Sequence, residues 1–256
     1  MKRKKRISDA CKIHEDFLDN IISNYDKKGE DFGNQKRNSL KLFRLEEKVF
    51  NVKSFKIPNF INQIAYRFFR KSKAQRSFEY AKILESLDIG TPQPIAYYEY
   101  KTLFLFKKSY YVSEQLDCEL TYRELTKDLN YPNHDRILRA FTRFTFNLHE
   151  KGIYFLDHSP GNTLISIENN NYKFFLVDLN RMKFEDLGYE ARIRNFAKLA
   201  TDEGMVRTMS EEYAKCIGAD PEDVFEKMWN YTQSFQNRFW RKKRMKKRIL
   251  FWRGFE

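Results

Sequence analysis

The spacing of the apolar residues changes along the chain, and this change constrains the fold more than any other feature of the sequence. Residues 39–56 are rich in the branched and aromatic types that strands favour, and residues 95–112 hold two further strand signals. Between them, residues 62–87 form a helical stretch, with room for two helices, that ends before Gly90. The first half therefore predicts a sheet accompanied by helices.

The second half has mainly helical spacing. Apolar residues recur at intervals of three and four over residues 135–151, which predicts an amphipathic helix. Short strand signals follow at 163–167 and 174–179, joined by a turn-like run of asparagines. The pattern is helical from Gly188 onward. Together the two halves predict an α+β fold with a strand-rich N-lobe and a mainly helical C-lobe.

Basic charge is concentrated at the two ends of the sequence. The formal net charge is +13, of which residues 2–6 supply +5 and residues 236–256 supply +8. The remaining residues, 7–235, carry equal numbers of acids and bases. A polyanionic partner would therefore be attracted to the ends of the chain and not to its whole surface.

Composition argues against several classes of protein. A hydrophobic content of 41% is too high for a disordered chain. No apolar run reaches the roughly 18 residues of a membrane span, and the basic N-terminus lacks the apolar stretch of a signal peptide. Cys11, Cys118 and Cys216 are too scattered for a disulfide framework, so we expect a reducing cytoplasm. Neither the cysteines nor the four histidines have zinc-ligand spacing.

One stretch of sequence carries recognisable chemistry. A helix pattern ends at Gly152, the next loop contains Asp157, and Asn162 follows five residues later. An apolar strand then leads directly to Asp178. This order resembles the catalytic loop and metal-binding segment of the protein-kinase-like superfamily, whose signature is H-x-D-x-x-x-x-N followed by D-F-G.

The resemblance implies a role for each of these residues. Phosphoryl transfer depends on positioning and charge neutralisation more than on covalent chemistry. Asp157 would then lie beside the hydroxyl that accepts the phosphoryl group. Asn162 and Asp178 would supply the hard oxygen ligands that suit Mg²⁺, and the phosphate donor would be ATP.

The superfamily also requires a lysine on a strand and an acidic partner on the following helix. The strand 51–56 is similar to the family sequence V-A-I-K, and Lys53 follows a valine as the family lysine does, so it is preferred to Lys56. Glu79 in the next helix is the expected partner of Lys53. Glu114 falls where the hinge between lobes should lie, and backbone groups there would hold the adenine.

A closer resemblance is to the bacterial lipopolysaccharide kinases, which phosphorylate Kdo or heptose sugars of the inner core. It extends over roughly residues 33–200. It implies a bilobal protein-kinase-like fold, the cofactors ATP and Mg²⁺, and a lipid-linked saccharide acceptor at the cytoplasmic leaflet. The segments that carry it are Val52 to Lys56, Lys73 to Ala81, Gly90 to Ala96, and Asp157 to Asn162.

Two departures from the family pattern concern the loops that approach the substrates. Phe155 stands two residues before Asp157, where many kinases have histidine, and a buried aromatic ring would replace it. The expected phosphate loop, 33–40, contains one glycine in place of the G-x-G-x-x-G motif. Backbone N–H groups could still cradle phosphate there, assisted by Lys36 or Arg37.

A third departure is that Asp178-Leu179-Asn180 replaces D-F-G. Leu179 is expected to pack as phenylalanine would, and Asn180 to tolerate a left-handed turn. His158, next to Asp157, is expected to contact backbone or substrate and not to serve as the base. None of the departures removes a metal ligand or the candidate base.

The C-terminal segment 236–256 mixes bases with aromatic residues. On a helix, Met245, Ile249 and Trp252 share one stripe. This pattern favours a helix on an anionic membrane surface. A helix whose apolar stripe docks on the C-lobe is an alternative, and nucleic-acid binding is a weaker one. The N-terminal basic run is expected to be a solvated end.

The expected divisions of the chain are a basic, helical extension (1–30), an N-lobe (31–114), a C-lobe (115–235) and a basic aromatic helix (236–256). The leading hypothesis is an ATP-dependent kinase of a lipopolysaccharide sugar that is cytoplasmic and peripheral on the inner membrane. One alternative is a non-catalytic kinase-like scaffold that binds membrane or nucleic acid. Another is a kinase with a small-molecule or protein acceptor. The sequence predicts no oligomeric state.

Overall fold

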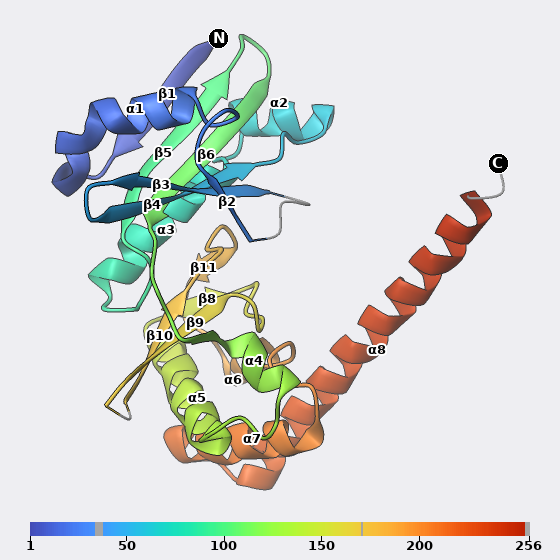
Figure 1. The fold of residues 1–256 in the computed structure, drawn as a ribbon. Helices are drawn as coiled ribbons and strands as arrows, with labels where there is room; N and C mark the ends of the chain where they lie inside the picture. The colour runs from blue at the N-terminus through green and yellow to red at the C-terminus, as the bar shows by residue number, and fades with distance from the viewer. Residues whose placement is uncertain (34–37, 170, 254–256) are drawn as a thin grey trace. The chain divides into compact units, whose positions relative to one another are not determined.

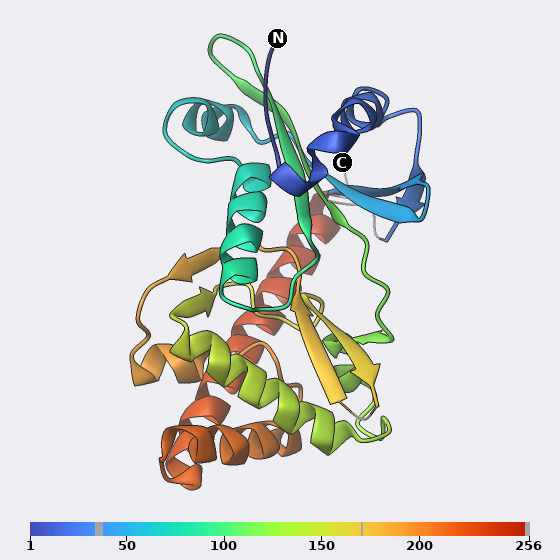
Figure 2. The same cartoon turned by 90° about the vertical axis from the view of Figure 1, so that its left-hand side faces the viewer.

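The chain divides into two compact units in the computed structural model shown in Figure 1 and, turned by 90°, in Figure 2. Unit 1 comprises Met1–Asp117 and Phe175–Arg181, and unit 2 comprises Cys118–Phe174 and Met182–Glu256. The structure describes residues 1–33, 38–169 and 171–253, with side chains as far as Arg248. The strand-rich first unit and mainly helical second unit confirm the predicted α+β fold class.

Unit 1 is built on a six-stranded antiparallel sheet. The strand order is β1-β5-β6-β4-β3-β2, so β5 to β6 and β3 to β4 are hairpins of neighbouring strands, as the sequence predicts. Strand β1 forms one edge by pairing with β5. The strands are β1 (Lys2–Ile7), β2 (Glu30–Phe32), β3 (Ser39–Leu45), β4 (Lys48–Phe55), β5 (Pro94–Lys101) and β6 (Phe106–Glu114).

Helices cover both faces of this sheet, with α1 on one side and α3 on the other (Figure 2). Successive residues of β5 point to opposite faces: Tyr98 is buried against the α1 side, and Tyr97 packs on Phe78 of α3. The predicted helical stretch 62–87 is two helices. The helical elements of this unit are η1 (Asp9–His14), α1 (Glu15–Ser23), α2 (Phe60–Phe68) and α3 (Lys73–Ser86).

A short downstream segment, Phe175–Arg181, belongs to unit 1 although it is distant in sequence. The N–H of Leu176 donates to the Gly90 carbonyl at 2.8 Å, and the Thr91 hydroxyl donates to the Leu176 carbonyl at 2.9 Å. Two hydrogen bonds on one residue fix the direction in which the chain continues. They therefore determine how Asp178, two residues later, enters unit 1.

Unit 2 surrounds helix α5 (His134–Glu150), the helix that the apolar spacing predicts over 135–151. Its strands form a three-stranded and a two-stranded sheet: β7 (Leu120–Thr121), β9 (Thr163–Glu168) and β10 (Asn171–Leu176), then β8 (Ile153–Phe155) and β11 (Met182–Phe184). The other helices are α4 (Tyr122–Lys127), α6 (Tyr189–Asn195), α7 (Glu203–Ile217) and α8 (Pro221–Arg253).

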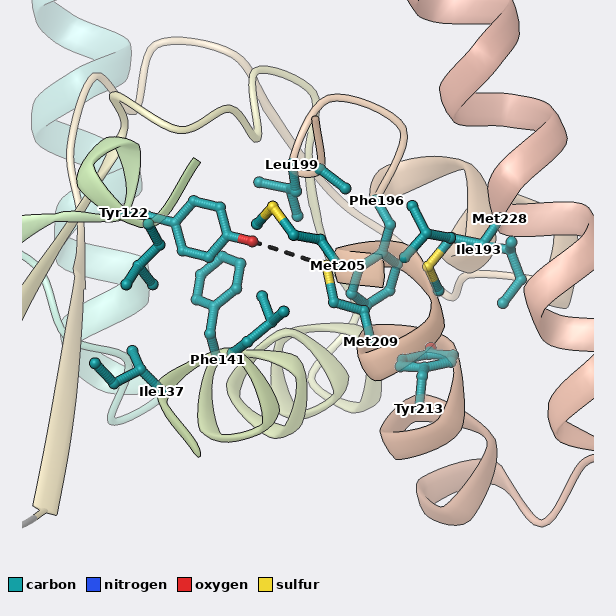
Figure 3. Close-up of a cluster of buried hydrophobic side chains, with 14 of the residues drawn as sticks. Tyr122, Ile137, Phe141, Ile193, Phe196, Leu199, Met205, Met209, Tyr213 and Met228 are labelled. Carbon is teal, nitrogen blue, oxygen red and sulfur yellow. Dashed lines mark hydrogen bonds between the residues drawn. The ribbon is translucent and has the colours of Figure 1, made fainter. Parts of the chain in front are cut away.

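The core of unit 2 is packed between α5, α6, α7 and the first turns of α8 (Figure 3). Phe141 of α5 is fully buried, and its ring lies 4.2 Å from that of Tyr122. The Tyr122 hydroxyl donates to the sulfur of Met209 at 3.7 Å, so its one polar atom is not left without a partner (Figure 3). This core holds the C-terminal end of α5, from which the loop containing Asp157 departs.

The two ends of the chain do not form separate segments. The first 30 residues, expected as an extension, supply β1 and α1 to the sheet and core of unit 1. The basic aromatic segment from 236 onward continues α8 without a break. No helix in the described part of the chain has the length and hydropathy to span a membrane.

Candidate functional site

In unit 1, Lys53 and Asp178 form an ion pair. Lys53 lies on β4, and its ammonium nitrogen is 2.8 Å from Oδ1 of Asp178. The lysine side chain is 15% exposed and the aspartate 32% exposed. The lysine is thus held near the sheet, while the carboxylate keeps a solvent-facing side that a substrate or metal could approach.

The backbone at Asp178 has an unusual conformation. Its φ is +59°, in the left-handed region that few residues other than glycine adopt. The sequence predicted that conformation for Asn180. Instead, Asn180 is buried and its side-chain amide donates to Oδ1 of Asp178 at 2.6 Å. Leu179 is buried, as expected. A strained backbone held by a side-chain hydrogen bond is typical of functional positions.

Glu79 has a different partner from the expected one. It accepts hydrogen bonds from Lys71 at 2.8 Å and from Gln75 at 2.9 Å, whereas Lys53 is paired with Asp178. Burial alone would raise the pKa of Glu79, but the Lys71 ammonium and the Gln75 amide lower it below its ordinary value. Glu79 is therefore a charged carboxylate near neutral pH, and in this structure it does not orient Lys53.

The backbone N–H groups at the predicted hinge residue, Glu114, and at the residue after it are engaged within unit 1. The N–H of Glu114 donates to the Gln93 carbonyl at 3.0 Å, and that of Gln115 donates to Val49 at 2.9 Å. Neither N–H is free for an adenine. Leu116 is the first residue after β6 whose N–H has no partner among the described residues. Sequence alone gives the end of the strand, but not which N–H groups its neighbours use.

The expected phosphate loop, 33–40, begins after β2 and ends within β3. Phe32 of β2 pairs with Leu40 of β3. Gly33 has a positive φ of +65°, which glycine adopts at no steric cost. Lys36 and Arg37, proposed to assist phosphate binding, lie outside the described residues.

In unit 2, Asp157 and Asn162 are joined through their loop. The side-chain nitrogen of Asn162 donates to the Asp157 carbonyl at 2.8 Å, and the Asn162 N–H donates to Ser159 at 2.9 Å. The Oδ1 atom of Asn162 accepts no hydrogen bond from a described residue. The loop thus fixes the asparagine by its nitrogen and leaves its oxygen for a ligand.

Lys198 contacts the loop of Asp157, and the sequence did not indicate this contact. It lies between α6 and α7, and its ammonium donates to the Leu156 carbonyl at 2.9 Å. The same nitrogen is 3.4 Å from Oδ1 of Asp157. A residue 41 positions downstream thereby supplies a cation beside the candidate base. Only the packing of α6 brings the two together, so no local motif could have identified it.

His158 points into the core and not toward solvent. It is 1% exposed, and its ring lies 5.4 Å from that of Phe141 and 5.6 Å from that of Phe155. Burial lowers its pKa to about 3, so the ring is neutral at physiological pH. Phe155 is fully buried, as predicted. The aromatic packing of both residues supports the loop on either side of Asp157.

A chain of hydrogen bonds anchors the same loop to α5, α6 and α7. His149 lies 2.8 Å from the Tyr213 hydroxyl through Nδ1 and 3.2 Å from Asn195 Oδ1 through Nε2. The Asn195 amide then donates to the Phe155 carbonyl at 2.9 Å. Burial lowers the pKa of His149 to about 4, so this connection involves a neutral ring. His149 and Asn195 are positioning residues that sequence analysis missed.

Each unit holds an oxygen donor of the kind that Mg²⁺ prefers: the Asp178 carboxylate in unit 1 and, separately, the Asn162 amide oxygen in unit 2. Among the described residues, no three His, Cys, Asp or Glu side chains gather into a metal site of their own. Mg²⁺ is commonly held by one or two protein ligands together with substrate phosphates and water, so either oxygen suits such a site.

Comparison with known proteins identifies the family. The model of the lipopolysaccharide kinase (Kdo/WaaP) family matches residues 56–215, more than half of the chain. No curated protein matches the sequence. Among solved structures, "WaaP in complex with acyl carrier protein" is similar with a TM-score of 0.62 and 11% identity. That match covers 92% of this chain and 97% of the other, and it supports the fold. The chain is therefore a kinase that belongs to the lipopolysaccharide kinase (Kdo/WaaP) family.

Proposed function

We propose that this lipopolysaccharide kinase transfers the γ-phosphoryl group of ATP, with Mg²⁺, to a hydroxyl of a Kdo or heptose sugar in the inner core. The observation that carries the proposal is the loop of Asp157 and Asn162. One hydrogen bond between them, of 2.8 Å, leaves the Asp157 carboxylate and the Asn162 oxygen available. These are the two groups that phosphoryl transfer requires from a catalytic loop.

Asp157 would accept the proton of the sugar hydroxyl. Its side chain is 34% exposed, so an acceptor can reach it without rearrangement of the core. The anchored backbone from Phe155 to Asn162 keeps the carboxylate in place. Positioning of this kind is the main contribution that a kinase makes to the rate of transfer.

Lys53 would bind the phosphates of the nucleotide. Its ammonium has three hydrogen-bond donors, and Asp178 uses one of them. Asp178 and Asn162 would hold Mg²⁺, which when bound supplies neutralisation of the phosphate charge. Asn180 keeps the Asp178 side chain in its orientation through the 2.6 Å hydrogen bond. The N–H of Leu116 would donate to the adenine.

Substitution of the candidate base tests the proposal. In Asp157→Asn the side chain keeps its size but can no longer accept a proton, so phosphate incorporation from ATP into Kdo–lipid A should fall by about 100-fold or more. Asp178→Ala should have a similar effect. The matched control is Asp186→Asn, an exposed aspartate of unit 2 that should keep full activity. Undiminished activity of either site variant would refute its assigned role.

A second proposal concerns the surface on which the enzyme works: the C-terminal half of α8 binds an anionic membrane. Its bases are exposed and have no ion-pair partner among the described residues. Phe239, Trp240 and Met245 are each about half exposed, which speaks against the alternative in which the helix docks on its own unit. The bases are Arg238, Arg241, Lys242, Lys243, Arg244, Lys246, Lys247 and Arg248.

Vesicle binding tests this second proposal. Replacing Lys242, Lys243, Lys246 and Lys247 together by Gln should weaken binding to phosphatidylglycerol vesicles by about 100-fold, because each base near an anionic surface contributes to attraction. Lys27→Gln with Lys28→Gln, two exposed lysines of unit 1, is the control and should bind normally. Binding to an acyl carrier protein or to nucleic acid, with none to vesicles, would reject the membrane in favour of that partner.

A further inference from the structure

Two cations without a full complement of acidic partners border the loop of Asp157. The first is Lys198. Its bond to the Leu156 carbonyl fixes the ammonium independently of Asp157, and the 3.4 Å separation from Asp157 Oδ1 is long for an ion pair. An ammonium has three donors, so at least one remains for a ligand. Its side chain is 31% exposed, which makes that donor accessible.

The second cation is Arg123, in the first turn of α4. Its guanidinium lies directly over Gly161 of the loop: a Cβ added at Gly161 would be 2.1 Å from Nη2 and 3.1 Å from Cζ. Glycine at this position therefore makes room for the arginine. Among the described residues, no carboxylate or carbonyl accepts a hydrogen bond from this guanidinium. The side chain is exposed, so its five donors face solvent.

The charges around the loop are not balanced. Between residues 156 and 162 the only acid is Asp157, whereas Lys198 lies beside Asp157 and Arg123 lies beside Gly161. An arginine without an acidic partner is suited to a planar anionic group, which it binds with two parallel hydrogen bonds. Both cations belong to unit 2, together with the loop that we assign to the acceptor. Lys53, assigned to the nucleotide phosphates, belongs to unit 1.

We propose that Arg123 and Lys198 form a binding site for an anionic oxygen group of the acceptor saccharide, a carboxylate or a phosphate, close to the hydroxyl that Asp157 deprotonates. This inference rests on the proposed function and adds the residues that recognise the charge of the acceptor. The anion orients the sugar relative to Asp157. A neutral sugar would leave Arg123 without a partner and would bind more weakly.

The test combines modified acceptors with enzyme variants, as in a double-mutant cycle, and measures KM for each combination. The acceptors are Kdo–lipid A, the same molecule with its carboxyl groups reduced to alcohols, and the same molecule without its phosphates. For Arg123→Gln we expect KM for native Kdo–lipid A to rise at least about tenfold, with KM for ATP unchanged. For one of the two modified acceptors, the KM of the wild type should be higher by the same factor, and Arg123→Gln should not raise that KM further. The modified acceptor that gives this result identifies the anion.

Gly161→Ala provides a variant that keeps every charge. The φ of Gly161 is not positive, so alanine suits the backbone, but its Cβ displaces the Arg123 guanidinium. We expect KM for the native acceptor to rise, and no further rise when Gly161→Ala is added to Arg123→Gln. Arg123→Lys should recover part of the affinity. Lys198→Gln should raise KM and also lower kcat, since Lys198 contacts Asp157.

The outcomes separate this inference from the proposed function. If wild type phosphorylates native acceptor and Arg123→Gln does so with the same KM, the anion site is rejected and the function stands. Equal effects of Arg123→Gln on all three acceptors, or a matching rise of KM for ATP, also reject it. If wild type phosphorylates none of the acceptors, the proposed function fails and this inference fails with it. Thermal unfolding of each variant identifies any that do not fold.

Discussion

The two basic ends of the chain have similar composition but different structural roles. In β1, Arg3 and Lys5 form ion pairs with Asp19 of α1 at 2.9 and 2.8 Å. On the other face of the strand, Lys4 and Arg6 lie over aromatic rings of unit 1. In α8, burial ends near Gln236, and every described residue from 237 to 248 is exposed.

The difference shows that the role of a run of basic residues depends on the side chains around it. The bases of β1 protect a sheet edge from pairing with another chain and join it to α1, so they serve the fold. Those of α8 have aromatic residues of the same helix as neighbours and no acids: Lys243 lies 4.7 Å from the Trp240 ring. The +5 of residues 2–6 therefore serves the fold, whereas the described bases of the +8 segment, residues 236–256, are available to a partner.

Removal of β1 should have the largest effect on stability. Deleting residues 2–7 exposes the β5 edge and removes Arg3 and Lys5, the cationic partners of Asp19 in β1, so we expect a loss of more than about 4 kcal/mol, a large part of the stability of an ordinary domain. Urea unfolding monitored by circular dichroism measures it. A deleted protein as stable as the intact chain would show that the N-terminal bases are a solvated end, as the sequence first suggested.

Substitution of Asp19 tests the connection between β1 and α1 by replacing one carboxylate with an amide. Asp19 accepts hydrogen bonds from Lys5 and from the Tyr98 hydroxyl, which is buried. Asp19→Asn should therefore cost about 2 kcal/mol, in the range for hydrogen bonds to charged groups. Asp16→Asn, an exposed aspartate of the same helix, is the control and should cost less than about 0.5 kcal/mol.

The loss of stability caused by Asp19→Asn should depend on pH. Burial acts to raise its pKa, but the hydrogen bonds from Lys5 and Tyr98 and the nearby Arg3 lower it below the ordinary value of 3.8. A carboxylate with a lowered pKa in the folded state stabilises the protein above its unfolded pKa, and this stability disappears as pH falls through the folded value. The difference between wild type and Asp19→Asn should therefore shrink below about pH 3.8. A constant difference down to pH 2 would contradict the charged pairing.

What the sequence predicts also depends on whether a feature is set by local residues or by distant neighbours. Elements could be predicted because their signals are local: the spacing of apolar residues in 135–151 places α5, and the branched residues of 39–56 place β3 and β4. The sequence order of Asp157, Asn162 and Asp178 was also readable as a motif. The sequence did not predict which side chains would pair with one another.

Partners depend on which side chains tertiary packing brings together. Lys53 binds Asp178 and not Glu79, and the Glu79 carboxylate is engaged by Lys71 and Gln75. Lys198 reaches Asp157, 41 positions away, through the tertiary fold of unit 2. The left-handed residue is Asp178, whose side chain contacts Asn180 and Lys53. None of these contacts has a signature in the spacing of residues along the chain.

Truncation of α8 should have the smallest effect on stability and so completes the comparison with β1. Ending the chain after Gln236 retains the hydrogen bond from the Gln236 side chain to the Thr201 carbonyl and removes only exposed side chains among those described. We expect the free energy of unfolding to change by less than about 0.5 kcal/mol. Stabilisation by Mg²⁺-ATP should be unchanged, about 2.7 kcal/mol at a concentration 100 times Kd. Binding to phosphatidylglycerol vesicles should be lost. If the truncated protein instead unfolds like the one without β1, both basic ends belong to the fold, and the charge excess reports nothing about the membrane.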